Sequence, residues 1–106
     1  MIQVNVKKQN ENIIGFRVDG HSGYAPHGSD IICSAVSILT INCINSIEEL
    51  TEDEFMVDTD EEQGLIDFTL QKEPSLEAEL LLRSWELGIA QISESYGEQY
   101  VLLINR

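Results

Sequence analysis

The chain has 106 residues, the size of one domain with one core, and 42% of them are apolar, which excludes a disordered chain. Its formal net charge is −13, from 19 acidic and 6 basic residues, and such a surface repels phosphate backbones. This balance argues against direct nucleic-acid binding and suits a basic partner, although the same charge can serve solubility alone. We therefore expect a single domain over residues 1–106.

In chain order, residues 2–8 and 13–19 alternate between polar and apolar side chains, which predicts two strands joined by a turn. Residues 20–29 contain three glycines and are expected to form a loop. Residues 31–50 then predict a helix with Asp30 as its N-cap. This helix is apolar on most sides, so we expect it to be buried between the sheet and either a second helix or a partner subunit.

Residues 54–60 and 64–71 predict a second hairpin, because apolar side chains again alternate with polar ones. Ser75 is expected to cap a second helix, whose apolar residues recur at helical spacing. Residues 99–104 predict a last strand. The order β-β-α-β-β-α-β predicts an α/β (α+β) fold: one sheet with two helices packed together on one face.

The two cysteines, Cys33 and Cys43, are not expected to form a disulfide. Ten residues of one helix would separate them by about 15 Å along its axis, whereas a disulfide needs Cα atoms within about 7 Å. Reduced thiols fit a reducing compartment. No stretch resembles a secretory signal or a transmembrane helix. We therefore expect a cytoplasmic protein without membrane association.

The loop and the first turn of the first helix hold the residues suited to catalysis. His21 follows the second strand, and Cys33 is the third residue of the helix that Asp30 caps. Unpaired amides and the helix dipole favour a thiolate at that position, and a nearby imidazole would favour it further. The pattern indicates a Cys–His nucleophile. The alternatives are that Cys33 is a small buried hydrophobic residue and that His21 makes an ordinary loop hydrogen bond.

Neighbouring residues leave two roles open. Asp30 can orient His21, as in a Cys–His–Asp group, or act as a helix cap alone, and its charge beside the thiol opposes the effect of the helix amides. Ser37 lies one turn after Cys33, where it can face the site or bond back within the helix. Cys43, deep in the apolar stretch, is expected to be a packing residue.

A metal site is the competing chemistry. His21, His27, Asp30 and Cys33 supply suitable donors, but their spacing matches no zinc pattern. We expect no metal and no cofactor, and we expect His27 to be an exposed loop residue.

The chain carries Gly20-His21 and then the run Gly28-Ser29-Asp30-Ile31-Ile32-Cys33-Ser34-Ala35-Val36-Ser37. This combination resembles the signature of the ribosomal-processing cysteine protease family (Prp) of bacteria, and the order of elements is similar over essentially the whole chain. The resemblance implies a small homodimeric protease. Such a protease removes the N-terminal extension of protein twenty-seven of the large ribosomal subunit, cutting after a phenylalanine in an apolar motif.

By the same resemblance, His21 is the catalytic histidine and Cys33 the nucleophile. The resemblance also assigns supporting roles to Asp30, Ser37 and Gly28. Gly28 matches a glycine of a mobile loop that, in the family, orders over the substrate. The sequence departs from the family at Ser22 and Ser34, where many members have alanine.

The mechanism implied is attack by the Cys33 thiolate on the carbonyl before the cut, followed by proton donation from His21 to the leaving amine. We expect backbone amides at the helix start, including that of Cys33, to hold the oxyanion. The alternative function is a non-catalytic ribosome-assembly module that binds a ribosomal protein precursor without cutting it.

Overall fold

The structure is a computed structural model that describes residues 1–26 and 29–106. Its elements follow the predicted order, and their ends differ from the predicted ones by at most two residues. They are β1 (Ile2–Gln9), β2 (Asn12–Asp19), α1 (Ile31–Leu50), β3 (Phe55–Asp60), β4 (Leu65–Leu70), α2 (Leu76–Tyr96) and β5 (Val101–Ile104).

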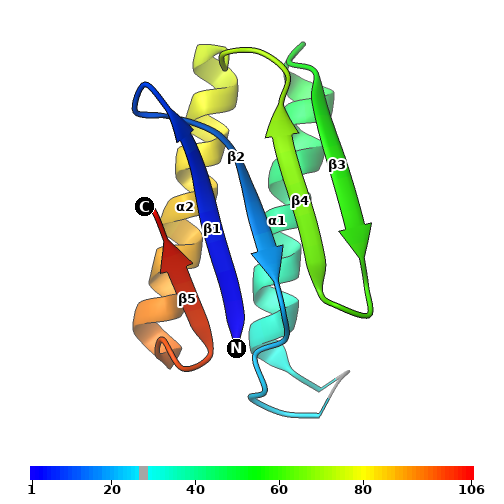
Figure 1. Cartoon of the computed structure of the whole chain (residues 1–106), viewed down its shortest axis with the longest axis vertical. Helices are drawn as coiled ribbons and strands as arrows, with labels where there is room; N and C mark the ends of the chain where they lie inside the picture. Colours follow the sequence, from blue (N-terminus) through cyan, green and yellow to red (C-terminus); the bar gives the residue numbers. More distant parts are fainter. Residues whose placement is uncertain (27–28) are drawn as a thin grey trace.

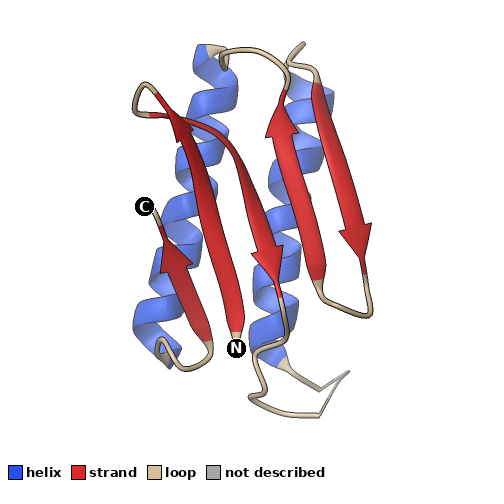
Figure 2. Ribbon diagram, viewed as in Figure 1, coloured by secondary structure: helices blue, strands red, loops and turns tan. Residues whose placement is uncertain are grey.

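The five strands form one sheet in the order β3-β4-β2-β1-β5. Strand β1 pairs antiparallel with β2 and parallel with β5, while β4 pairs antiparallel with both β2 and β3. Both helices lie side by side on the same face of the sheet (Figures 1 and 2). The predicted sheet with two helices on one face is therefore confirmed.

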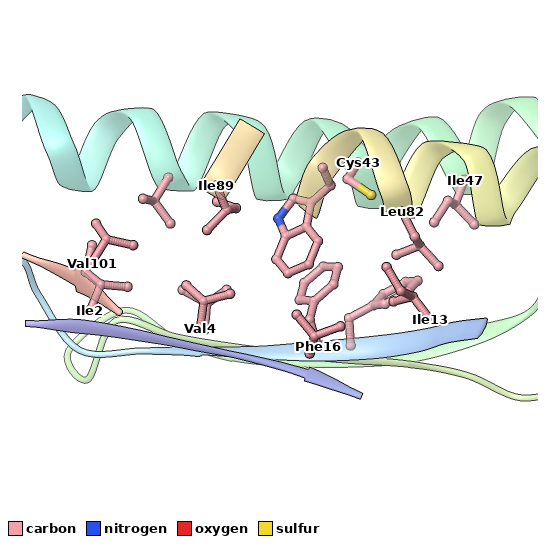
Figure 3. Packing of buried hydrophobic residues seen from close by; sticks show 14 of the residues in the cluster. Ile2, Val4, Ile13, Phe16, Cys43, Ile47, Leu82, Ile89 and Val101 are labelled. Atoms are coloured by element: carbon pink, nitrogen blue, oxygen red, sulfur yellow. The ribbon is translucent and has the colours of Figure 1, made fainter. Parts of the chain in front are cut away.

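The core fills the space between the sheet and the two helices (Figure 3). The ring of Phe16 stacks between Phe68 and Trp85, with ring centroids 5.0 and 4.2 Å apart. The indole Nε1–H of Trp85 donates to the hydroxyl of Thr40 at 3.0 Å. Because both groups are buried, this bond satisfies polar atoms that water cannot reach. It also ties α2 to α1.

Helix α1 is less buried than expected. Its core-facing residues are Ile32, Val36, Thr40, Cys43 and Ile47. The opposite side exposes Ile31 (55%), Ile38 (69%) and Ile41 (49%), because the sheet and α2 cover only part of the helix. By length and composition alone α1 could cross a membrane, which the sequence analysis did not expect. In the fold, the need to pack against both the sheet and α2 explains much of its apolar content.

Helix α2 begins as predicted. The hydroxyl of Ser75 accepts from the amide of Ala78 at 3.1 Å, so Ser75 is the N-cap. The carboxylate of Asp53 in turn accepts from the Ser75 amide at 2.9 Å and from its hydroxyl at 2.5 Å. This pair joins the segment before β3 to the start of α2.

Candidate active site

The described residues of the predicted site, His21, Asp30, Cys33 and Ser37, line pockets at the place where the loop between β2 and α1 meets the β3–β4 turn. Strand β2 runs toward this end of the sheet (Figure 1). Strand β2 ends at Asp19, His21 follows it, and Cys33 lies in the first turn of α1. The amide of Gly20 donates to the carbonyl of Gln63 at 3.0 Å, which fixes the loop to the turn. Two segments distant in sequence therefore build the site: the stretch from the end of β2 to the first turn of α1, and the β3–β4 turn.

Asp30 is the N-cap of α1, as predicted. Its Oδ1 accepts from the amides of Ile32 and Cys33, both at 3.0 Å, and its Oδ2 accepts from the hydroxyl of Ser22. The side chain is 5% exposed. Burial raises its pKa, but hydrogen bonds from Ser22, Cys33 and Ile32 more than offset this and lower the pKa to about 2. Asp30 is therefore a fixed negative charge at neutral pH.

The half-buried thiol of Cys33 lies against the loop. Its Sγ accepts a hydrogen bond from the backbone amide of Ser22 at 3.3 Å. The amide of Cys33 itself is bonded to Asp30. The expectation that this amide holds the oxyanion is therefore wrong for the arrangement seen here, because the helix cap already occupies its hydrogen. The amide of Ser22 is the one directed at the sulfur.

Ser22 is a site residue that the sequence analysis missed. It is 3% exposed, its amide faces Cys33, and its hydroxyl both donates to Asp30 and accepts from the amide of Tyr24 at 3.1 Å. A serine in a glycine-containing loop is usually a surface residue, so the sequence carried no signal for this burial. In the fold, Ser22 holds the loop against the start of α1.

The imidazole of His21 contacts the β3–β4 turn. Its Nε2 lies 3.1 Å from the main-chain carbonyl oxygen of Glu62. The carbonyl of His21 accepts from the amino nitrogen of Met1 at 2.6 Å. The contact with Glu62 was also missed, because it involves a main-chain atom and no side chain.

Two adjoining pockets share His21, Cys33 and Glu61 in their walls. The smaller, of about 410 Å³, also contacts Asp30, and the larger, of about 610 Å³, extends between α1 and the β3–β4 hairpin. The larger pocket has an apolar lining that includes Val36, Ile41, Ile44, Val57 and Ile66, and Ser37 also lies in its wall. The structure thus places the two predicted catalytic side chains on a common surface with room for a peptide segment.

The remaining predicted residues divide clearly. Both cysteines are free thiols, which confirms that they do not pair. Cys43 packs in the core, where burial raises its pKa to about 12, so it stays a neutral thiol. Gly28 and His27 lie outside the described residues. Within residues 1–26 and 29–106, no cluster of three side chains is suited to hold a metal ion.

Comparisons with known proteins agree with this arrangement. The family model described as cysteine protease Prp matches residues 1–101. The ribosomal processing cysteine protease Prp of Bacillus subtilis (strain 168) is 26% identical over 110 residues, covering 99% of this chain and 98% of that protein.

Two solved structures share the fold. The ribosomal processing protease Prp of Staphylococcus aureus, in complex with a covalently linked product peptide, has a TM-score of 0.92 and 25% identity over 98% of both chains. SMU.848 of Streptococcus mutans has a TM-score of 0.83 and 26% identity over 98% of this chain and 92% of that one. With the family model matched over residues 1–101, and with a free thiol and an imidazole in the walls of the same two pockets, the chain is a cysteine protease that belongs to the Prp family.

Proposed function

We propose that this protease removes the N-terminal extension of protein twenty-seven of the large ribosomal subunit, with Cys33 as nucleophile and His21 as acid and base. The observation that carries the proposal is that both side chains line the same two pockets, with the Ser22 amide directed at the sulfur. The names of the relatives support the substrate class. The Bacillus protein is a ribosomal processing protease, and the Staphylococcus protein has been solved with substrate and product peptides.

The reaction begins with transfer of the Cys33 proton to His21. The sulfur then attacks the carbonyl carbon before the scissile bond and forms a tetrahedral adduct. As the carbon–nitrogen bond breaks, the imidazolium of His21 donates its proton to the leaving amine, and a thioester to Cys33 remains. Water, deprotonated by His21, attacks the thioester and releases the acid product and the free thiol. Each step needs only the two side chains and one water molecule.

Asp30 supports this chemistry through Ser22. Its carboxylate holds the hydroxyl of Ser22 and the first amides of α1, so it fixes the loop amide over the Cys33 sulfur. We assign Asp30 as a positioning residue on these contacts. Ser37 is placed in the wall of the larger pocket, where it can contact a bound peptide. Gly28 keeps the supporting role that the family resemblance implies.

The protease is proposed to act in the cytoplasm as a homodimer. Free thiols suit a reducing compartment. Ile31 and Ile38, exposed on α1 and outside both pocket walls, supply an apolar surface for a second copy. A monomer in light scattering at micromolar concentration contradicts the homodimer. The net charge of −13 favours encounter with a basic ribosomal protein.

The test is mass spectrometry of the purified protein incubated with the ribosomal precursor. Wild type is expected to release the N-terminal extension, and alkylation of the thiol is expected to stop the release. Cys33→Ala is expected to bind the precursor without cutting it. Cys43→Ala is the matched control, since it removes a thiol that lies in the core and not in the pockets.

Two outcomes oppose the proposal. If Cys33→Ala cuts the precursor at the wild-type rate, Cys33 is not the nucleophile. Tight binding by wild type without any cutting favours the assembly-module alternative instead.

A further inference from the structure

The β3–β4 turn is built to reach His21. Within the turn, Oδ1 of Asp60 accepts from the amides of Glu62 and Gln63 at 3.0 and 3.3 Å, and the Gly64 amide donates to Glu61 at 3.2 Å. These bonds fix its main chain independently of the β2–α1 loop. The turn therefore presents its carbonyl groups in a defined direction.

Gly64 allows the loop and the turn to approach each other closely. Its φ is +64°, a conformation that side chains other than glycine adopt at a cost. A Cβ at this position would lie 2.3 Å from the carbonyl oxygen of Gly20 and 3.2 Å from Cε1 of His21. A larger residue must therefore separate the turn from the main chain at Gly20, the residue before His21, and it also crowds the imidazole.

The contact between His21 and Glu62 selects one form of the imidazole. A carbonyl oxygen can only accept a hydrogen bond, so Nε2 must carry the hydrogen. In the neutral ring, Nδ1 is then the nitrogen that carries no hydrogen and can take up a proton. When the ring is protonated, Nε2 keeps its hydrogen and the same bond becomes charge-assisted. The Glu62 carbonyl can thus hold the ring both when it takes a proton and when it gives one.

We propose that the main-chain carbonyl of Glu62 orients the imidazole of His21 for catalysis, and that Gly64 is the positioning residue that lets the turn reach it. This inference rests on the proposed Cys33–His21 mechanism. In many nucleophile–histidine pairs a third side chain orients the histidine. Here the described contacts of the Asp30 carboxylate go to Ser22 and to the amides of α1.

The first experiment reads the imidazole directly. Nitrogen-15 NMR of the protein at a pH where the ring is neutral distinguishes the Nε2–H from the Nδ1–H tautomer. The chain has two histidines, so a His27→Gln variant leaves His21 as the single signal. We expect the Nε2–H tautomer. A predominantly Nδ1–H ring overturns the inference, whatever any variant does.

The second experiment displaces the turn. Gly64→Ala is expected to lower kcat for precursor cleavage about 100-fold, a loss that a misplacement of about 1 Å can cause, with little change in KM. Its imidazole is expected to become a mixture of tautomers. Ile13→Val is the control, because it trims a buried side chain of β2 near the opposite end of the sheet and is expected to retain the wild-type kcat. If Gly64→Ala does not fold, Asp60→Ala loosens the same turn and is expected to change kcat in the same direction.

The outcomes distinguish the role of the β3–β4 turn from the Cys33–His21 mechanism. Wild type that cuts through Cys33, together with a Gly64→Ala protein of unchanged kcat and unchanged tautomer, refutes the role of the turn and leaves the protease mechanism standing. Wild type that does not cut, or cutting that survives Cys33→Ala, refutes the mechanism on which the inference rests.

Discussion

The charge of Asp30 should make a measurable, pH-dependent contribution to stability. Asp30→Asn keeps a side chain that caps helices well, so the start of α1 should remain formed. The substitution removes the titration of the carboxyl and replaces one of its two acceptor oxygens with an NH2 donor. The Ser22 hydroxyl loses its acceptor, which changes the stability by an amount that does not vary with pH. The pH dependence of the stability difference between the two proteins therefore reports the titration of the buried carboxylate that accepts from Ser22 and from two helix amides.

The magnitude follows from the pKa. Burial raises the pKa of Asp30, the hydrogen bonds outweigh it, and the pKa falls from 3.8 to about 2. A carboxyl with a lowered pKa in the folded state stabilises the fold above its unfolded pKa, and this contribution is lost as the pH falls through the folded pKa. The shift corresponds to about 2 kcal/mol in the free energy of unfolding. This contribution is complete above about pH 4 and lost near pH 2.

The assay is urea unfolding of wild type and Asp30→Asn between pH 2 and 6, at one protein concentration. Wild type is expected to lose about 2 kcal/mol more than the variant across this range. Asp53 and Asp67 also have lowered pKa values, where burial raises them and hydrogen bonds from Ser75 and Lys7 respectively outweigh it. Both titrate in each protein, so they cancel in the difference. A difference between the two proteins that does not change with pH refutes the reasoning.

Other predictions concern the thiols, the core and the loop. A thiol reagent should modify Cys33 in the native protein and leave Cys43 unmodified, since burial raises the pKa of Cys43 to about 12; double labelling of folded protein, seen by mass spectrometry, contradicts this. Thr40→Val should lower the free energy of unfolding by about 1–3 kcal/mol, because the Trp85 indole loses its buried acceptor. An unchanged urea midpoint is the contrary result. Tyr24→Ala removes ring contacts to two tyrosines at the α2–β5 junction, so residues 22–25 should exchange amide hydrogens faster; equal exchange shows that these rings do not hold the loop.

Much of the fold could be predicted because it depends on local patterns. Alternating apolar residues defined the strands, and the apolar run after Asp30 defined α1 to its last residue. Asp30 and Ser75 were recognisable as caps, because a cap bonds amides only two or three residues away. The separation of Cys33 and Cys43 along one helix was enough to exclude a disulfide. Each of these inferences uses a distance along the chain that secondary structure converts directly into a distance in space.

What only the tertiary structure decided involves atoms brought together from distant segments. Parallel pairing of β5 with β1 was not predictable, because α2 carries the chain across the sheet before the two strands meet. The burial of Ser22 and the contact of its amide with the Cys33 sulfur depend on how the loop folds back on α1. The contact of His21 with the carbonyl of Glu62 spans 41 residues and uses an atom that every residue has. The sequence by itself could therefore nominate the sulfur and the imidazole, but only the folded chain shows which main-chain groups surround them, because a carbonyl or an amide acquires its role from position and not from residue type.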